Sequence, residues 1–558
     1  MWIVRGREGC HVIVYWFLKM PLFISVTLLL WKVYCILRFF GGIMFFWRRK
    51  NSLVQAKQWN NPSQVKLLVL SAKQAAVQIH SRQLTSQELV KCYIDRMKAI
   101  NPYLNAAVCY RFEEAMNQAQ EVDRILDGQT IPPEYSPEKK PLLGVPFTVK
   151  ESHSLMGMPH TGGLYKRKGT TASVDSPVIR RLKDAGGIPI ASTNCSELCM
   201  WYESSNNVYG TTNNPYNVNC MVGGSSGGEG SINAAACSVF GIGGDIGGSV
   251  RMPCFFCGIF GHKHSPHLTP GGNEFPPTSG DARSYVARSP MCRYSIDLPF
   301  VLDIMAGNAI EGSSSLTSKV ASVDITKLSF FSIANDGGSW YASPVEQQLV
   351  DAQSEVVDHL RSHYKVDVLE TKLQKLQYSL GVWLTAINEN KSSHPFCEYM
   401  ANLEGSVNPF WEFCKWLVGK SLHTLPCIGL GAIEKLTTFT KSKVKSEKVK
   451  AITQCLKTEL EDLLGPNGIL LYPSHPNVAP PHHKAIYMPF NFAYTAVFNI
   501  LGFPATQIPL GLNHQGLPLG VQIVSTTGND HLTIAVVVEL ERTMSKCGWV
   551  CPPKYLLK

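Results

Sequence analysis

The sequence predicts an α/β protein. Short apolar runs with the length of buried strands recur along the chain, at residues 142–150, 188–192, 237–245, 469–475 and 520–525. Stretches with apolar residues at helical spacing lie between them, and this alternation is typical of α/β architectures. The composition agrees with a folded domain, since 45% of the residues are hydrophobic and 17% are charged.

One helix has well-marked ends in the sequence. Thr85 is a candidate N-cap, and Glu88, three residues later, completes a capping box. Apolar residues follow at helical spacing as far as Pro102, which is expected to end the helix. The chain from residue 66 onward contains no internal repeat and no low-complexity segment, so we expect a single domain there.

The first 50 residues differ from the rest. Residues 11–47 are strongly apolar and aromatic, interrupted by Lys19, Lys32 and Arg38. The longest charge-free run, 20–31, would span about 18 Å as a helix, against a hydrocarbon core of about 30 Å. A single span with snorkelling lysines, a re-entrant hairpin and a cleaved signal peptide are the alternatives. We favour a retained anchor, because no convincing small-residue cleavage site is present.

We therefore divide the chain into a hydrophobic membrane anchor with a basic flank at 1–50, a polar linker at 51–65 and the main domain at 66–558. The basic residues 48–50 favour a cytoplasmic flank. We thus expect a membrane protein, either single-pass or monotopic, whose main domain faces the cytoplasm. The endoplasmic reticulum and the lipid droplet are the candidate locations. The net charge of +10 is scattered along the chain, so no nucleic-acid partner is expected.

The 17 cysteines are irregularly spaced, and many lie in apolar stretches. This usage is typical of reduced thiols in a chain that faces the cytosol. Cys254 and Cys257 form a C-x-x-C pair, and Cys195 and Cys199 a C-x-x-x-C pair, so a four-thiolate zinc site is one alternative. Small buried hydrophobic residues are the simpler interpretation, and we expect no metal and no cofactor.

Two glycine-rich segments that contain serine lie close together, at 223–230 and 243–251. A linker would be polar and monotonous, whereas residues 232–242 between them are rich in alanine and aliphatic side chains. A phosphate-binding loop would need a G-K-[ST] triplet or a G-x-G-x-x-G fingerprint, and neither fits. Acyl transfer fits better, because glycines leave room for a carbonyl group beside backbone N–H donors.

A serine nucleophile also needs a base. None of the 16 histidines stands in a triad context that the sequence reveals. Lys150 ends the apolar run 142–150, where burial would favour the uncharged amine that can accept a proton. An exposed lysine at the end of a strand is the alternative that the sequence leaves open.

These motifs resemble the amidase signature family. The segment "GGSSGGEGSINAAACSVFGIGGDIGGSVRMPCFFCGIFGHK" resembles its signature, and "GVPFTVKES" resembles its lysine motif. Residues 193–216 and the segments "NILGFPATQIPLGL" and "GLPLGVQIV" extend the similarity over roughly residues 66–558. Within the family, the similarity is greatest to the membrane-bound fatty-acid amide hydrolases of type 2. His264 departs from the pattern, because the family usually has proline there.

The resemblance implies a large mixed β-sheet covered by helices and a Ser–cis-Ser–Lys triad. Ser249 is the implied acyl-ester nucleophile, Ser225 at a non-proline cis peptide is the relay, and Lys150 is the base. The implied oxyanion and substrate-binding groups are the backbone N–H groups of Ile246, Gly247, Gly248 and Ser249, together with Met200. The implied supporting residues are Asp245, Arg251 and Ser226, with an ordinary structural ion pair as the alternative for Asp245 and Arg251.

The implied reaction is hydrolysis of fatty-acid amides, primary amides and N-acylethanolamine-like lipids, to free fatty acid and amine. The expected partners are this substrate and a membrane or lipid surface, and a homodimer is a candidate assembly. Residues 408–436 interleave aromatic side chains with Lys415 and Lys420, as in an interfacial amphipathic helix or a core helix. The alternative functions are transamidation, as in the glutamyl-tRNA amidotransferases that share the signature, and catalytically silent lipid binding.

Overall fold

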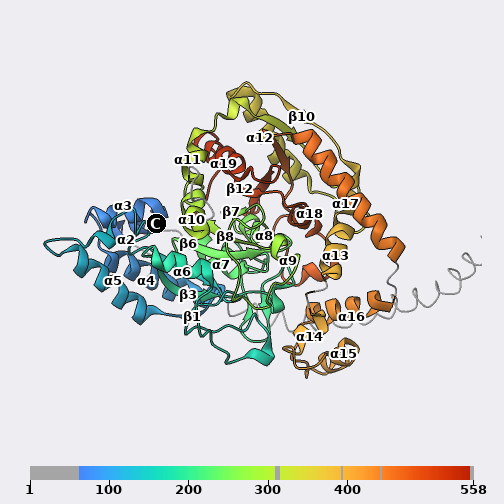
Figure 1. Cartoon of the computed structure of the whole chain (residues 1–558), viewed down its shortest axis with the longest axis horizontal. Helices are drawn as coiled ribbons and strands as arrows, with labels where there is room; N and C mark the ends of the chain where they lie inside the picture. The colour runs from blue at the N-terminus through green and yellow to red at the C-terminus, as the bar shows by residue number, and fades with distance from the viewer. Residues whose placement is uncertain (1–61, 308–314, 391, 393, 440–442, 553–558) are drawn as a thin grey trace, which may run out of the picture. The chain divides into compact units, whose positions relative to one another are not determined.

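The structure, a computed structural model, describes residues 62–552 except 308–314, 391, 393 and 440–442 (Figure 1). The chain divides into two units, and the larger, Gln58–Lys558, contains every described residue. The anchor predicted at 1–50 lies outside the described residues, as does most of the linker predicted at 51–65. No helix in the described part of the chain is both long enough and apolar enough to cross a bilayer.

One mixed sheet of 11 strands organises the described unit. The order across the sheet is β1 (Ala107–Tyr110), β3 (Ile188–Thr193), β2 (Pro146–Lys150), β6 (Phe240–Asp245), β8 (Ala287–Cys292), β7 (Phe260–Lys263), β12 (Ala505–Leu512), β13 (Pro518–Val524), β11 (Gly468–Tyr472), β9 (Ser329–Ser332) and β10 (Val368–Glu370). Strand β2 is parallel to both β3 and β6, whereas β6, β8, β7, β12 and β13 follow one another in antiparallel pairs. The predicted α/β fold with a large mixed sheet is therefore confirmed.

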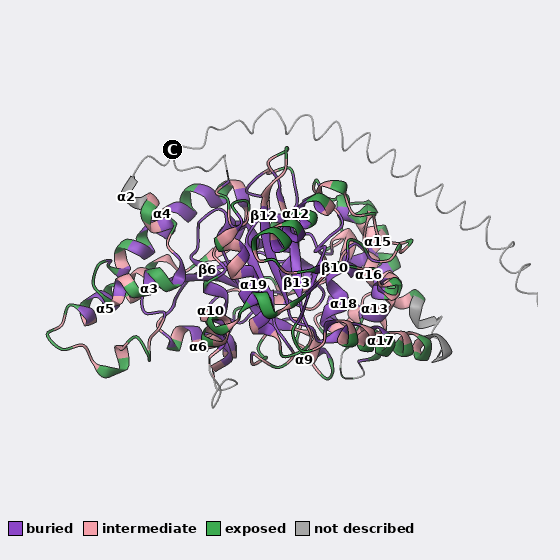
Figure 2. Ribbon diagram, turned by 90° about the horizontal axis from the view of Figure 1, so that it is seen from above, coloured by how far each residue is buried: buried purple, intermediate pink, exposed green. Residues whose placement is uncertain are grey.

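Helices surround the sheet. Figure 2 shows buried residues concentrated on the strands and exposed residues along outer helices such as α5 (Phe112–Leu126) and α17 (Lys443–Leu464). The first half of the chain contributes α2 (Pro62–Leu68), α3 (Ala72–His80), α4 (Ser86–Leu104), α5 (Phe112–Leu126), α6 (Pro177–Asp184), α7 (Gly227–Ala234), α8 (Arg251–Phe256) and α9 (Ala282–Tyr285). The second half contributes α10 (Asp297–Ala306), α11 (Leu316–Ser322), α12 (Gln347–His363), α13 (Ser379–Glu389), α14 (Phe396–Met400), α15 (Pro409–Leu417), α16 (Leu425–Phe439), α17 (Lys443–Leu464), α18 (Ala493–Leu501) and α19 (Asp530–Thr543).

The central strands are buried along their whole length. Every residue of β2, β3, β8 and β11 is buried. Burial on both faces explains why β2, β3 and β11 lie in mostly apolar runs without the alternation of a half-exposed strand. The five runs predicted as strands correspond to β2, β3, β6, β11 and β13. Helix α7 packs beside β6, and α8 packs beside β12 and β13, so the two glycine-serine segments lie near the middle of the sheet.

Helix α4 begins as predicted but ends later. Thr85 caps the helix and forms the capping box with Glu88. Pro102, however, lies inside the helix, which continues to Leu104 and ends at Asn105 in the left-handed conformation. The prediction that Pro102 ends the helix was wrong, because a proline in the last turn removes only one backbone hydrogen bond.

The segment 408–436 forms two helices, α15 and α16, and not one. Helix α15 and the turn after it expose several large apolar side chains, among them Trp411 at 62% and Val418 at 67% exposure. Pro409 and Glu412 are the buried residues of α15. The core-helix alternative is therefore wrong for α15.

Candidate active site

Lys150 lies at the carboxyl end of β2, between β3 and β6. Its side chain is buried, with 2% of the residue exposed. Its Nζ donates a hydrogen bond to Ser225 Oγ at 2.7 Å. The alternative of an exposed strand-end lysine is therefore wrong, and the structure brings the lysine into direct contact with the first of the two serines.

Ser225 follows a cis peptide bond, Gly224–Ser225, as the family resemblance implies. Residues 196–202 pack against this peptide, and the Ser196 N–H donates to Ser225 O at 3.4 Å. A Cβ added to Gly224 would lie 2.6 Å from Trp201 O, so position 224 has no room for a side chain. Met200 belongs to this same loop, which we call the 196–202 loop.

Ser249 lies on the turn that joins β6 to α8, and it is 7% exposed. The Ser226 N–H donates to Ser249 O at 3.2 Å, and the Ser226 hydroxyl bonds to the backbone of Gly244 at 3.3 Å. The two glycine-serine segments therefore meet. Gly248 has a φ of 110°, and a Cβ there would lie 1.9 Å from Thr495 Oγ1, so only glycine fits this turn.

The four backbone N–H groups around Ser249 differ in whether they already have a hydrogen-bond acceptor. The Gly248 N–H donates to Asp245 Oδ1 at 2.7 Å and is therefore engaged within the loop. The N–H groups of Ile246, Gly247 and Ser249 have no protein acceptor among the described residues. Free, convergent N–H groups beside a serine hydroxyl are what an oxyanion requires, so three of the four predicted donors are available in this structure.

Asp245 and Arg251 form a fully buried ion pair across the turn, with Arg251 Nη2 3.0 Å from Asp245 Oδ1. Asp245 also accepts hydrogen bonds from the N–H groups of Gly248 and Val250. Burial raises the pKa of Asp245, but the Arg251 charge and these hydrogen bonds together hold it below its ordinary value. The pair thus ties both ends of the Ser249 turn together.

Two polar residues of α18 complete the turn and were missed in the sequence. Thr495 donates its hydroxyl to Gly247 O at 2.8 Å, and Asn499 donates its amide to Asp245 Oδ1 at 3.0 Å. They are four residues apart, so they lie on one face of a helix that is otherwise apolar. Polar residues at that spacing in the segment "AYTAVFN" were the signal that could have identified them.

Glu229 of α7 contacts the same strand as Lys150 and was also missed. Its carboxyl group accepts hydrogen bonds from Thr148 of β2 at 2.6 Å and from Thr193 of β3 at 2.8 Å. Burial raises the pKa of Glu229 from 4.5 to about 8, so the buried carboxyl group takes up a proton more readily than it does in the unfolded chain.

Glu229→Gln is expected to alter the pH dependence of stability. Because the folded pKa is raised, the stability of the wild type should fall as the pH rises between 4.5 and about 8. The variant should show a smaller decline over this range in thermal or denaturant unfolding. Glu121→Gln, at an exposed position, should retain the wild-type dependence. Indistinguishable pH dependence in wild type and Glu229→Gln would contradict the assignment.

The described residues contain one group with the ligand types of a metal site. The side-chain donors of Glu197, His423 and Cys427 lie within 4.8 Å of one another, and all three residues are buried. Glu197 already accepts hydrogen bonds from His423 Nδ1 and the Thr424 N–H, each at 2.7 Å. The group is thus satisfied as a hydrogen-bonded cluster. Among the described residues, Cys254 and Cys257 do not join Cys195 and Cys199 in a four-thiolate group.

His264 is buried and has two hydrogen-bond partners. Its Nδ1 lies 2.6 Å from Ser265 O, and its Nε2 lies 2.7 Å from Thr269 Oγ1. Burial lowers the pKa of His264 to about 4, so its ring is neutral at physiological pH. The departure from the family pattern is therefore accommodated by local hydrogen bonds.

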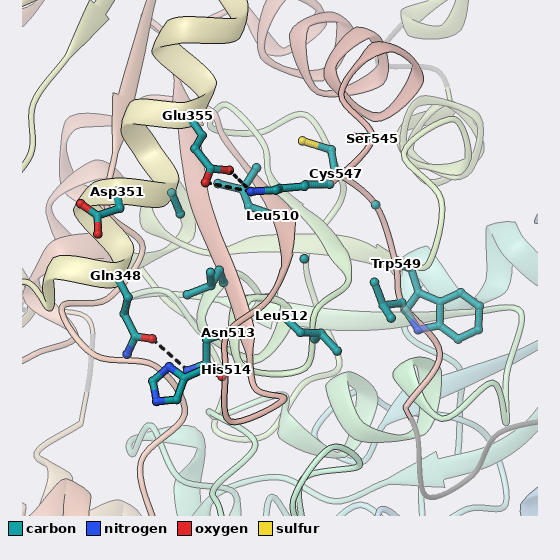
Figure 3. Close-up of a pocket in the computed structure, with 16 residues that line it drawn as sticks. Gln348, Asp351, Glu355, Leu510, Leu512, Asn513, His514, Ser545, Cys547 and Trp549 are labelled. Atoms are coloured by element: carbon teal, nitrogen blue, oxygen red, sulfur yellow. Dashed lines mark hydrogen bonds and ion pairs between the residues drawn. The ribbon is translucent and has the colours of Figure 1, made fainter.

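A groove of about 510 Å³ lies elsewhere, between α12, the β12–β13 hairpin and residues 545–550 (Figure 3). Two polar contacts join residues that line this groove. They are the ion pair between Lys546 and Glu355 and the hydrogen bond from Asn513 to Gln348. None of the predicted site residues lines this groove. The candidate active site is therefore the region where the Lys150–Ser225 hydrogen bond lies beside the turn that carries Ser249.

The site and the fold identify the class of protein. The family profile described as Amidase matches residues 88–534, which is most of the chain. The chain belongs to the amidase family, and it is an enzyme of that family. The resemblance stated from the motifs is thus confirmed.

The chain is 47% identical over 493 residues to Fatty-acid amide hydrolase 2 of Homo sapiens, with 88% of this chain and 91% of that protein covered. It is 26% identical over 481 residues to Indoleacetamide hydrolase of Bradyrhizobium diazoefficiens, with 84% and 86% covered. The solved structure described as Fatty acid amide hydrolase has a TM-score of 0.66 and 20% identity, covering 86% of each chain. That structure supports the fold.

Proposed function

We propose that this protein hydrolyses fatty-acid amides through an acyl-enzyme, with Ser249 as nucleophile, Ser225 as proton relay and Lys150 as base. The observation that carries the proposal is the 2.7 Å hydrogen bond between Lys150 Nζ and Ser225 Oγ, made in the interior of the sheet. The Lys150 amine is buried, and its side-chain hydrogen-bond partner among the described residues is the Ser225 hydroxyl. Amines of this kind act as bases once they have lost their proton.

In this mechanism the Ser249 oxygen attacks the amide carbonyl carbon while its proton moves to Ser225 Oγ. Ser225 passes its own proton to Lys150 Nζ. When the tetrahedral intermediate collapses, the C–N bond breaks, and the proton returns through Ser225 to the leaving nitrogen. Water then attacks the acyl carbonyl carbon while its proton passes through Ser225 to Lys150. The bond between the acyl carbon and Ser249 Oγ breaks, the proton returns through Ser225 to Ser249, and the fatty acid is released.

The oxyanion is stabilised by the N–H groups of Ile246, Gly247 and Ser249. The carbonyl groups of the first two residues are held in place, because Trp383 Nε1 donates to Ile246 O at 2.9 Å and Thr495 donates to Gly247 O at 2.8 Å. Fixed donors of this kind stabilise the transition state by a few kcal/mol each. The Gly248 N–H is not assigned to the oxyanion, because its hydrogen bond to Asp245 holds the loop in shape.

An apolar wall beside the oxyanion loop supports an acyl substrate. Trp383 and Phe492 pack edge to face with ring centroids 5.0 Å apart, and both lie within 4 Å of the position of a Cβ on Gly247. Met200 has a flexible apolar side chain and belongs to the 196–202 loop, whose backbone contacts Ser225. Together with the relative named Fatty-acid amide hydrolase 2, this wall favours a lipid amide over a glutaminyl substrate.

A panel of amides tests the substrate class. Long-chain primary amides and N-acylethanolamine-like lipids should be hydrolysed with a higher kcat/KM than acetamide or glutamine. The reason is that only a long acyl chain can pack against the apolar side chains of Trp383 and Phe492. Release of fatty acid and ammonia or ethanolamine is the readout. A preference for glutamine, or a requirement for a copurifying partner protein, would favour the transamidation alternative. Lipid binding without turnover would favour the silent binding protein.

We also propose that the main domain contacts the membrane through α15 and α16, on the cytoplasmic side of the endoplasmic reticulum or a lipid droplet. The exposed apolar residues of this region are Phe410, Trp411, Leu417, Val418, Leu422, Ile433 and Leu436. Lys415 and Lys420 lie among them and suit an anionic lipid surface. A retained anchor at 1–50, a linker at 51–65, an amidase domain at 66–558 and a homodimer remain part of this proposal.

Trp411→Ala is expected to separate membrane docking from chemistry. Trp411 is 62% exposed on α15, so its removal should lower the hydrolysis of a long-chain amide embedded in vesicles severalfold. Hydrolysis of a short, soluble amide should not change. Leu369→Ala, an exposed apolar position on the edge strand β10, should affect neither substrate. Equal losses on both substrates would exclude the docking role.

A further inference from the structure

Lys263 is a buried lysine that the proposed mechanism does not use. It is the last residue of β7 and of the segment that resembles the family signature, and 2% of it is exposed. Burial of an ammonium group costs free energy unless hydrogen bonds or opposite charges compensate for it. The contacts of this amine therefore need a physical account.

The Lys263 side chain bonds to two carbonyl oxygens at the end of α18. Its Nζ donates to Phe498 O at 3.1 Å and to Phe503 O at 2.6 Å. Helix α18 ends at Leu501, and Gly502 follows in the left-handed conformation with a φ of 77°. The carbonyl groups of a last helical turn carry partial negative charge, so an ammonium group is favourable there. Lys263 is thus a C-terminal cap of α18 that comes from a strand of the sheet.

The charges around Lys263 do not replace these two hydrogen bonds. Burial lowers the pKa of Lys263 to about 7, and the positive charge of Arg251 lowers it as well. Asp245 and Asp530 act in the opposite direction, but Asp245 is paired with Arg251 and Asp530 with His262. In the described part of the chain, hydrogen bonds to carbonyl groups, and not an ion pair, hold the Lys263 amine.

The capped end of α18 is also the end that holds the Ser249 turn. Asn499, which follows the first capped carbonyl group, donates its amide to Asp245 O and to Asp245 Oδ1, each at 3.0 Å. One turn earlier, Thr495 donates its hydroxyl to Gly247 O at 2.8 Å. Because a helix moves as a rigid element, a shift of α18 would displace both contacts with the Ser249 turn.

The backbone of Lys263 is fixed by the same sheet that carries this turn. Lys263 pairs with Ala505 of β12, and β7 pairs on its other side with β8. Strand β8 in turn pairs with β6, which leads into the Ser249 turn. The lysine side chain therefore ties α18 to the sheet on which the nucleophile is mounted.

We propose that Lys263 is a positioning residue for amide hydrolysis, whose amine caps α18 and so holds Thr495 and Asn499 against the turn that carries Ser249. The inference rests on the proposed function for its effect on the rate. Lys263 takes no part in proton transfer. It acts through the position of the nucleophile and of the neighbouring N–H donors, and small displacements of such groups lower the rate strongly.

Lys263→Met tests the cap, because methionine is a flexible side chain without a donor. The full-length variant should hydrolyse a long-chain amide with a kcat about tenfold below that of wild type, since a displacement of ~1 Å can cost about 100-fold. KM should change little, because Phe492 precedes α18 and Trp383 lies on α13, both away from the capped end. Lys263→Gln, which keeps an N–H donor, should recover part of the lost rate.

Arg181→Met is a matched control for the loss of a cation at a helix end. Arg181 Nη1 donates to Met305 O at 2.8 Å at the end of α10, a helix that carries none of the proposed catalytic residues. This variant should keep the kcat of wild type. Thermal unfolding of all variants establishes that each is folded at the assay temperature.

Hydrogen–deuterium exchange provides a readout that needs no activity. Amide exchange in residues 244–251 should be faster in Lys263→Met than in wild type, whereas Arg181→Met should change exchange at the end of α10 and not in 244–251. If Lys263→Met does not fold, Lys263→Gln is measured in its place and should show a smaller loss of kcat and a smaller rise in exchange.

Three results would overturn the proposal. They are a folded Lys263 variant with the kcat of wild type, an equal loss of kcat in the Lys263 and Arg181 variants, and unchanged exchange in residues 244–251. A wild type without any amidase activity would instead count against the proposed function, while the exchange measurement would still decide whether Lys263 holds the Ser249 turn.

Discussion

Replacing Ser249 with alanine should lower amide hydrolysis by a factor on the order of 10⁴ to 10⁶, because losing a serine nucleophile removes the covalent step itself. The same change should abolish labelling by a fluorophosphonate reagent. The fold should survive, since the Ser249 contact with Ser226 uses the backbone carbonyl, and the turn is held by Asp245, Arg251 and Gly248. Thermal unfolding close to that of wild type would establish this.

Ser289→Ala provides a matched control for the loss of a buried hydroxyl. Ser289 lies on β8 opposite Gly243, and its hydroxyl has no hydrogen-bond partner among the described residues. Its removal should leave hydrolysis and labelling close to wild type. Persistent labelling of Ser249→Ala would show that another residue is the nucleophile. A full loss in Ser289→Ala would show that the measurement responds to packing and not to chemistry.

Asp245→Ala should lower the free energy of unfolding by about 3–5 kcal/mol, because it leaves Arg251 buried without its counter-charge. Arg251 is completely buried, and its other partners are Thr495 O, Gln522 Oε1 and Asn499 Oδ1, none of them charged. The variant should also lose activity, since the Gly248 N–H loses the acceptor that shapes the Ser249 turn. Denaturant unfolding measures the first effect.

Two comparisons make this stability prediction specific. The double variant Asp245→Ala/Arg251→Met should be less destabilised than the sum of its single variants, since both charges are then absent. Lys91→Ala, which breaks an exposed ion pair with Asp95, should change stability little. Because the pKa of Asp245 is held below its ordinary value, its contribution should be complete above that value and lost as the pH falls below it. Additive losses in the double variant would contradict a coupled pair.

Some features of the fold and site were accessible from local sequence. The apolar runs predicted β2, β3, β6, β11 and β13, because a strand buried on both faces must be apolar throughout. The capping box at Thr85 and Glu88 was equally local, since its two hydrogen bonds join residues three apart. The motifs around Lys150, Ser225 and Ser249 pointed to the right family.

Other features depended on contacts between distant segments. The sequence left open whether Lys150 is exposed, and the neighbours of β2 in the sheet decided that it is buried. It could not show that Asp245 engages the Gly248 N–H, nor that Thr495 and Asn499 close the Ser249 turn from about 250 residues away. It also left open which faces of α15 and α16 are exposed.

The sequence by itself predicted five of the strands, the beginning of one helix and the side chains that we propose carry the chemistry. These properties follow from the spacing of residues a few positions apart. Only the tertiary structure decided which of these groups touch and which backbone donors remain free. Burial and hydrogen bonding depend on what packs against a residue, and in this protein the partners come from strands and helices that are distant in the chain.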